Sequence, residues 1–319
     1  MHRVEVVFDP DSCTPPDVGS AVTIGAYDGV HLGHQRLLAE LRAMGEARGL
    51  VTTVVTFDRH PATVVRPGSA PLLLTDLPQK LELLGAAGVG RTLVVPFDEQ
   101  RAAESAEDFV REVLVGRLRA RLVVVGENFH FGHRRRGDVG LLEQMGGEYG
   151  FDVVGLRLEA DREQEETVSS TRIRALVASG DVVGARRLLG RPHTVRGRVA
   201  RGDGRGGAKL GFPTANLQVP SGMAIPADGI YACRYERSDG SILAAAVSIG
   251  RRPTFYEAGD RVLEAHILDF DGDLYGEQAR LWFVERLRDD RRFESSEALV
   301  AQMEADVTQA REILAADGS

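Results

Sequence analysis

The chain has 319 residues, of which 43% are hydrophobic and 27% charged, and a formal net charge of −8 at pH 7. These values are ordinary for a soluble protein of about two domains, and the negative charge argues against a general nucleic-acid-binding protein. The chain contains only two cysteines, no signal-peptide pattern and no apolar run that could cross a bilayer, so we expect a cytoplasmic protein without disulfides or a membrane partner.

Short apolar segments alternate with helical patterns in the first half of the chain. Residues 1–20 contain three prolines and are expected to be irregular or to form an edge. Strands are then expected at 21–24, 51–57, 93–97, 122–125 and 153–158, and helices at 35–44, 77–87, 141–149, 171–178 and 182–189. This alternation predicts a parallel sheet covered on both faces, which binds ligands at the carboxyl ends of its strands.

The sequence pattern changes near Gly190. Six strand-like segments separated by Gly, Pro and Asp turns follow at 195–200, 214–219, 230–235, 243–249, 262–270 and 279–287. Six short strands in roughly 100 residues predict a small antiparallel β-barrel, and the chain ends with an amphipathic helix at 295–315. We therefore expect two domains, residues 1–189 and 190–319.

The most distinctive stretch is Gly-Ala-Tyr-Asp-Gly-Val-His-Leu-Gly-His, which occupies residues 25–34 directly after the first buried strand. Its glycines permit a tight turn, and His31 and His34 fall on the first turn of the following helix. The amino end of a helix favours anions, and imidazoles can hydrogen-bond phosphate oxygens. The stretch predicts a polyphosphate site; a zinc site needs a third ligand, and none is obvious.

This stretch resembles the signature of bacterial bifunctional riboflavin kinase/FAD synthetases, members of the wider His-x-Gly-His nucleotidyltransferase superfamily. The resemblance implies a Rossmann-like FMN adenylyltransferase domain in which His31, His34 and Arg174 act in catalysis. It also implies nucleotide or flavin contacts from further residues of the first half: Gly25, Asp28, Gly29, His60, Asn128, Ser170 and Thr171. Phe129 and Phe131 could stack on a ring, and one or more of Arg134, Arg135 and Arg136 could contact ligand.

A glycine-rich loop followed by Gly-Phe-Pro-Thr-Ala-Asn, ending at Asn216, resembles the riboflavin kinase signature. The resemblance implies that Thr214 and Asn216 coordinate Mg²⁺ and that Glu264 is the general base. The same resemblance implies that the nucleotide is approached by Gly204, Gly206, Gly211, Phe212 and Pro213. The loop is one residue longer than the family pattern and lacks its second arginine. Considered by itself, a glutamate within a strand is more often a solvent-facing residue.

The two motif sets predict a bifunctional enzyme that phosphorylates riboflavin to FMN and then adenylylates FMN to FAD, using ATP and Mg²⁺. The alternatives are an FMN adenylyltransferase with an impaired kinase, another adenylyltransferase of the superfamily and a non-catalytic flavin-binding regulator. The expected partners are small molecules, and the expected state is a monomer or a weak homo-oligomer. Only Lys80 and Lys209 are lysines, so arginine, histidine, backbone amides or metal are expected to meet phosphate charge.

Overall fold

The structure is a computed structural model that describes residues 4–157, 168–200, 212–251 and 261–317. Its backbone contacts divide the chain into two compact units, residues 1–170 and 171–319. Helices α7 (Ser170–Ser179) and α8 (Val182–Leu189) thus fall almost entirely in the second unit. The reason is visible for α8, which contacts strands of the barrel and contributes Val182 to the barrel's buried core. Residue 190, the boundary expected from the sequence, remains our proposal for where the second functional module begins.

The first unit contains a six-stranded parallel sheet of order β1-β4-β3-β2-β5-β6. Its strands are β1 (Glu5–Phe8), β2 (Ser20–Ile24), β3 (Val51–Phe57), β4 (Arg91–Val95), β5 (Ala120–Gly126) and β6 (Asp152–Leu156). From β2 the chain runs outward through β3 and β4, and it then returns to the other side of β2 to form β5 and β6. The point between β2 and β5 is therefore the topological switch point, where parallel sheets of this kind bind ligands.

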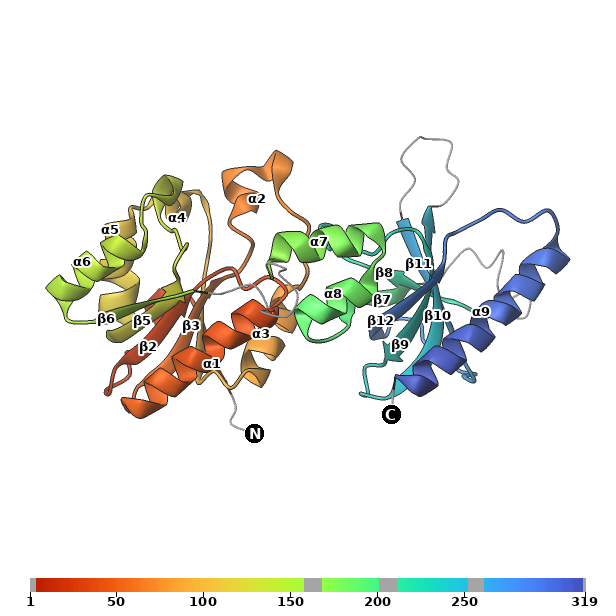
Figure 1. Ribbon diagram of the computed structural model, residues 1–319, viewed down its shortest axis with the longest axis horizontal. Coiled ribbons are helices and arrows are strands. Elements are labelled where there is room, and N and C mark those ends of the chain that lie inside the picture. The colour runs from red at the N-terminus through yellow and green to blue at the C-terminus, as the bar shows by residue number, and fades with distance from the viewer. Residues whose placement is uncertain (1–3, 158–167, 201–211, 252–260, 318–319) are drawn as a thin grey trace. The chain divides into compact units, whose positions relative to one another are not determined.

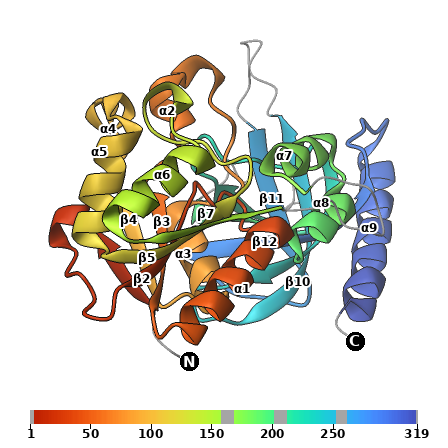
Figure 2. The ribbon, with the colours of Figure 1, turned by 60° about the vertical axis from the view of Figure 1, so that its left-hand side comes forward.

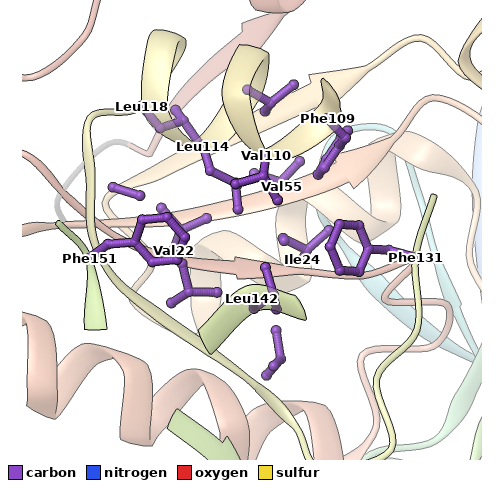
Figure 3. Packing of buried hydrophobic residues seen from close by; sticks show 14 of the residues in the cluster. Val22, Ile24, Val55, Phe109, Val110, Leu114, Leu118, Phe131, Leu142 and Phe151 are labelled. Carbon is purple, nitrogen blue, oxygen red and sulfur yellow. The ribbon is translucent and has the colours of Figure 1, made fainter. Parts of the chain in front are cut away.

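Helices cover both faces of this sheet (Figures 1 and 2). The larger helices are α1 (Leu32–Ala47), α3 (Leu77–Ala86) and α6 (Val139–Tyr149), and the shorter segments are α2 (Ala62–Val65), α4 (Glu99–Ala103), α5 (Ala106–Phe109) and the π-helical η3 (Val110–Arg117). Alternate residues of β2 point to opposite faces. Ala21 packs with Leu41 of α1, whereas Val22 packs with Leu142 of α6 in the core drawn in Figure 3.

The second unit contains a closed antiparallel barrel of order β10-β11-β8-β7-β12-β9. Its strands are β7 (His193–Ala200), β8 (Ala215–Gln218), β9 (Gly229–Glu236), β10 (Ile242–Arg251), β11 (Arg261–Ile267) and β12 (Gln278–Arg288). Alternate residues fill the interior, among them Leu263, Ala265 and Phe283. Helix α9 (Ser296–Ala316) packs Ala310 and Leu314 against the outer face of the barrel. The outward-facing side of several strands is thereby covered as well.

The fold confirms the predicted parallel sheet, the six-stranded antiparallel barrel and the final helix. Strand β1 pairs with β4 at the sheet edge and lies in the segment 1–20, which was expected to be irregular or to form an edge, whereas the short helices α2 and α4 were not predicted. A four-residue edge strand and one-turn helices are too short to show a recognisable hydrophobic period.

Replacing Leu142 by alanine tests the core between α6 and the sheet. Leu142 is fully buried, so the substitution leaves a cavity and should lower the free energy of unfolding of the first unit by about 2–5 kcal/mol. Urea-dependent hydrogen exchange of amides in β2 and β5 measures this change. Leu72→Ala is the matched control, because Leu72 is 53% exposed and its truncation should change stability by less than about 1 kcal/mol.

Candidate active sites

The loop that follows β2 has a strained backbone. Gly29 has φ +84°, which glycine adopts readily, but Tyr27 and Val30 also lie in the left-handed region at φ +49° and +38°. Such a conformation is a genuine outlier for a β-branched residue and costs about 1–3 kcal/mol. Other parts of the structure must therefore hold this loop in place.

Hydrogen bonds from the segment before α3 hold the loop. The Asp28 carboxylate, buried from solvent, accepts hydrogen bonds from the backbone amides of Leu74 and Thr75 at 2.9 and 3.0 Å. The Thr75 hydroxyl in turn accepts from the Gly29 amide at 3.1 Å. Ser170, the first residue of α7, donates its hydroxyl to the Asp28 carbonyl at 2.9 Å. Asp28 and Ser170, both predicted from the sequence to contact nucleotide, thus also brace the loop.

The two histidines stack at the amino end of α1. Their ring centroids are 3.6 Å apart, and His31 Nδ1 accepts a hydrogen bond from the His34 amide at 3.3 Å, so His31 caps the helix. Because Nδ1 is the acceptor, the neutral His31 ring carries its proton on Nε2. His31 can therefore donate a hydrogen bond to an anion from the atom opposite its capping nitrogen.

The His34 side chain is partly buried, and its surroundings favour the neutral ring. Burial is the main reason that its pKa lies well below the ordinary value, and the adjacent His31 lowers the pKa further. Its Nδ1 atom is buried without a hydrogen-bond partner in the described part of the chain. An unpartnered buried nitrogen is costly, and a bound phosphate oxygen could satisfy it.

The remaining predicted residues of this site lie on three segments. His60 follows β3, and its Nδ1 accepts from the Ala62 amide at 3.1 Å, so the neutral ring again carries its proton on Nε2. Asn128 lies exposed after β5. Thr171 and Arg174 lie along α7. The expectation that Phe131 stacks on a ligand is not supported, because Phe131 is buried in the core of the sheet.

Sequence analysis did not identify Lys80 of α3 as a site residue. Its Nζ donates to the carbonyl oxygens of Ala26 and Phe57, which lie at the carboxyl ends of β2 and β3. The one feature of the sequence that could have drawn attention to Lys80 is the rarity of lysine, since Lys80 is one of two lysines among 39 basic residues.

A second group of predicted residues lies in one row across the outer face of the barrel. Asn216 of β8 is directly opposite Glu264 of β11, which is directly opposite Ser248 of β10. Directly opposed residues of antiparallel strands project from the same face of the sheet, so these three side chains are neighbours. Thr214, two residues before Asn216, extends the same face by one row.

A cavity of about 360 Å³ lies over this row, between the barrel and the amino-terminal half of α9. Its lining includes the polar side chains of Thr214, Ser248 and Glu264, and the ring of Phe212. The far wall is fixed by Arg288, whose guanidinium forms two short hydrogen bonds, 2.9 and 2.7 Å, with the buried Asp306 carboxylate. The carbonyl oxygen of Pro213 is 2.9 Å from Nδ1 of His266. Gly204, Gly206 and Gly211 fall outside the described residues.

The oxygen atoms at this site fit a hard divalent cation. The side-chain oxygen of Asn216 is buried and has no hydrogen-bond partner among the described residues. Mg²⁺ prefers oxygen ligands, completing its shell with phosphates and water, and the Thr214 hydroxyl supplies a second oxygen. The side-chain oxygen of Asn216 is therefore suited to coordinate Mg²⁺.

Comparisons with known proteins identify the family of this chain. Residues 14–172 match the family model described as FAD synthetase, and residues 189–314 match the one described as riboflavin kinase. The chain is 38% identical over 298 residues to the bifunctional riboflavin kinase/FMN adenylyltransferase of Escherichia coli strain K12, covering 93% of both chains. It belongs to the bifunctional riboflavin kinase/FMN adenylyltransferase family.

Other relatives in this family are comparably similar. The Pseudomonas fluorescens protein of the same description is 38% identical over 94% of this chain and 95% of its own length. A solved structure described as a macrolide-efflux protein from Streptococcus pneumoniae is 28% identical, with a TM-score of 0.85, over 97% of this chain and 99% of that one. We take only the fold from that structure; in the described residues of this chain, no helix has the length and apolarity to cross a membrane.

The lowered pKa of His34 predicts a pH dependence of stability. The unfolded chain binds a proton on His34 below about pH 6.5, whereas the folded chain does not until a lower pH. The neutral His34 ring therefore makes its full contribution to the free energy of unfolding above about pH 6.5, and this contribution is lost as the pH falls below that value. Thermal unfolding without ligand at pH 7 and pH 5 should show a smaller loss of stability in His34→Gln than in the wild type. His130→Gln, at an exposed histidine, should behave like the wild type.

Proposed function

We propose that the two units carry out consecutive ATP-dependent reactions. The enzyme phosphorylates riboflavin to FMN in the barrel unit and transfers an adenylyl group from ATP to FMN in the sheet unit, releasing pyrophosphate and forming FAD. The observation that carries this division is the direct opposition of Asn216 to Glu264, whose side chain lines the cavity. A cation ligand beside a carboxylate suits phosphoryl transfer to a hydroxyl, and the histidine pair is in the other unit.

In the kinase reaction, Glu264 accepts the proton of the terminal ribityl hydroxyl as that oxygen attacks the γ-phosphorus of ATP, and ADP leaves as the bond from the γ-phosphorus to the bridging oxygen breaks. The Asn216 and Thr214 oxygens would hold Mg²⁺, which supplies charge compensation on the transferred phosphoryl group when bound. The flavin ring fits the apolar part of the cavity, where Leu299 and Val307 of α9 form one wall. Phe212, which lines the cavity, and Pro213 directly precede β8, and we propose that both lie beside the bound nucleotide.

In the adenylyl-transfer reaction, the FMN phosphate attacks the α-phosphorus of ATP in line, and pyrophosphate leaves. His31 Nε2 and the ring of His34 donate hydrogen bonds to phosphate oxygens at the positive end of the α1 dipole. Gly25 and Gly29 let the backbone approach the nucleotide, and we propose further contacts from His60, Asn128, Thr171 and Arg174. No protein nucleophile is needed, because orientation and charge stabilisation account for catalysis of phosphoryl and nucleotidyl transfer.

Replacing Glu264 by glutamine should separate the two activities. Loss of the general base should lower the rate of FMN formation from riboflavin by about 10²- to 10⁴-fold, while conversion of supplied FMN to FAD stays within twofold of the wild type. Chromatography of products from riboflavin alone and from FMN alone measures both steps. Glu285→Gln, at an exposed glutamate of β12, is the control and should change neither activity.

His31→Ala should give the reciprocal result, loss of FAD formation with retained FMN formation. Loss of both activities in a folded His31→Ala or Glu264→Gln protein would contradict the two-site division. If the wild type formed FAD from FMN but no FMN from riboflavin, the protein would be an adenylyltransferase alone. Tight flavin binding without either product would instead indicate a regulator.

Asn216→Ala tests the proposed Mg²⁺ site. Removing an oxygen ligand should raise the Mg²⁺ concentration needed for half-maximal kinase activity by about 10- to 100-fold. The melting temperature in the absence of Mg²⁺ should not fall, because Asn216 Oδ1 has no partner to lose among the described residues. Gln218→Ala, at an exposed position on the same strand, is the matched control. An unchanged Mg²⁺ requirement in Asn216→Ala would exclude Asn216 as a ligand.

A further inference from the structure

Lys80 connects the two loops that lead into the adenylyl-transfer site. It lies in the first turn of α3, is only 7% exposed, and donates hydrogen bonds to Phe57 O at 2.9 Å and Ala26 O at 3.3 Å. Ala26 belongs to the strained loop after β2. Phe57 ends β3 and immediately precedes the segment that carries His60. A single ammonium group therefore joins the loop before the histidine pair to the loop containing His60.

The connection lies where the sheet no longer holds these segments together. The β2–β3 ladder ends at Ile24 and Val55, followed by one more bond from the Gly25 amide to the Val55 carbonyl. Beyond that point, the Ala26 carbonyl oxygen accepts two hydrogen bonds. One comes from the Thr56 hydroxyl at 3.3 Å, and the other comes from the Lys80 ammonium. Because the loop after β2 contains strained residues, it needs contacts of this kind to keep one geometry.

The segment that contains Lys80 holds the loop after β2 at both ends. Six and five residues before Lys80, the Leu74 and Thr75 amides bind the Asp28 carboxylate, as described above. The residues from Leu74 to Lys80, which we call the brace segment, thus contact Ala26, Asp28 and Gly29.

The charge of Lys80 is expensive to bury. Burial lowers its pKa to about 8, while the carboxylates of Asp28 and Asp58 act in the opposite direction. Asp28 binds the amides of the brace segment, and Asp58 binds Arg59 and the Phe97 amide. A methionine would pack into the same space without the desolvation penalty, so packing alone does not account for a lysine here.

We propose that Lys80 is a positioning residue for adenylyl transfer, which joins the loop after β2 to the loop after β3 and thereby fixes the histidine pair relative to His60. The inference rests on the proposed adenylyl-transfer function of the first unit. Lys80 acts through backbone carbonyl groups and does not need to touch ATP or FMN. Small displacements of positioned groups lower rates strongly, by as much as about 10²-fold for a shift of 1 Å.

The test compares Lys80→Met, Lys80→Gln and Arg42→Met in the full-length protein. Methionine keeps the length and apolar stem of lysine but donates no hydrogen bond, whereas glutamine keeps a donor group. Arg42→Met is the matched control, because Arg42 also donates to a backbone carbonyl, that of Ala87 at 3.4 Å, but far from both loops along α1. Initial rates with FMN as the only flavin give kcat and KM for adenylyl transfer, and rates with riboflavin give the kinase activity of the same protein.

We expect Lys80→Met to lower kcat/KM for FAD formation by about 10- to 100-fold, with kinase activity within twofold of the wild type. The kcat/KM of Lys80→Gln for FAD formation should be at least threefold higher than that of Lys80→Met. Arg42→Met should lose neither activity. Hydrogen exchange provides a second measurement that does not depend on turnover. In Lys80→Met, the Gly29 amide should exchange faster than in the wild type, while amides of α6 should be unchanged.

Three results would overturn the inference. An adenylyl-transfer rate within twofold of the wild type in Lys80→Met would show that Lys80 only fills space. A parallel loss of kinase activity, or faster exchange throughout the first unit, would show a general loss of stability. A Lys80→Gln variant no better than Lys80→Met would show that donation to the carbonyls is not the reason for the lysine. A wild type that forms no FAD from FMN would overturn the proposed function as well.

Discussion

The nucleotidyl-transfer unit depends on one conformational constraint, the strained turn between β2 and α1. Tyr27 and Val30 have left-handed backbone angles there, so the turn cannot hold its shape by local preference. Its geometry is imposed by Asp28, Gly29 and Ala26, which bind the brace segment, and by the sheet behind them. The stacked histidines follow directly on α1. A turn that relaxed would therefore move both imidazoles away from the proposed phosphate position.

In the kinase unit, the side chains of the site are held in place by the barrel itself. Asn216, Glu264 and Ser248 occupy one row of a closed barrel, where each strand is held by two neighbours and no edge is free. The side chains that we propose for the kinase site are thus placed by strand register, not by a strained loop. Register also determines which residues face outward: Leu263 and Ala265 enter the barrel core, and the intervening Glu264 faces the cavity beneath α9. A shift of one residue would bury the carboxylate in the barrel interior.

Sequence reasoning was most successful where hydrophobic period and length were both clear. The strands at 51–57 and the helix at 182–189 have the predicted bounds, and β8 and β11 were found within a few residues. It was least successful with the short helices, whose patterns are too brief. It interpreted Phe131 as a possible ligand contact, although tertiary packing buries that ring in the core. It also overlooked Lys80, because a lysine in an amphipathic helix ordinarily faces solvent.

The sequence by itself determined the two architectures and the two groups of polar residues, because both depend on local order along the chain. Glycine spacing, the His-x-Gly-His pattern and the alternation of strand residues all operate over a few positions. Only the tertiary structure decided that Asn216 and Glu264, 48 residues apart in the chain, are directly opposed, and that Lys80 binds carbonyls at the ends of two strands. Such contacts depend on how strands pair and how helices pack, and no short stretch of sequence records them.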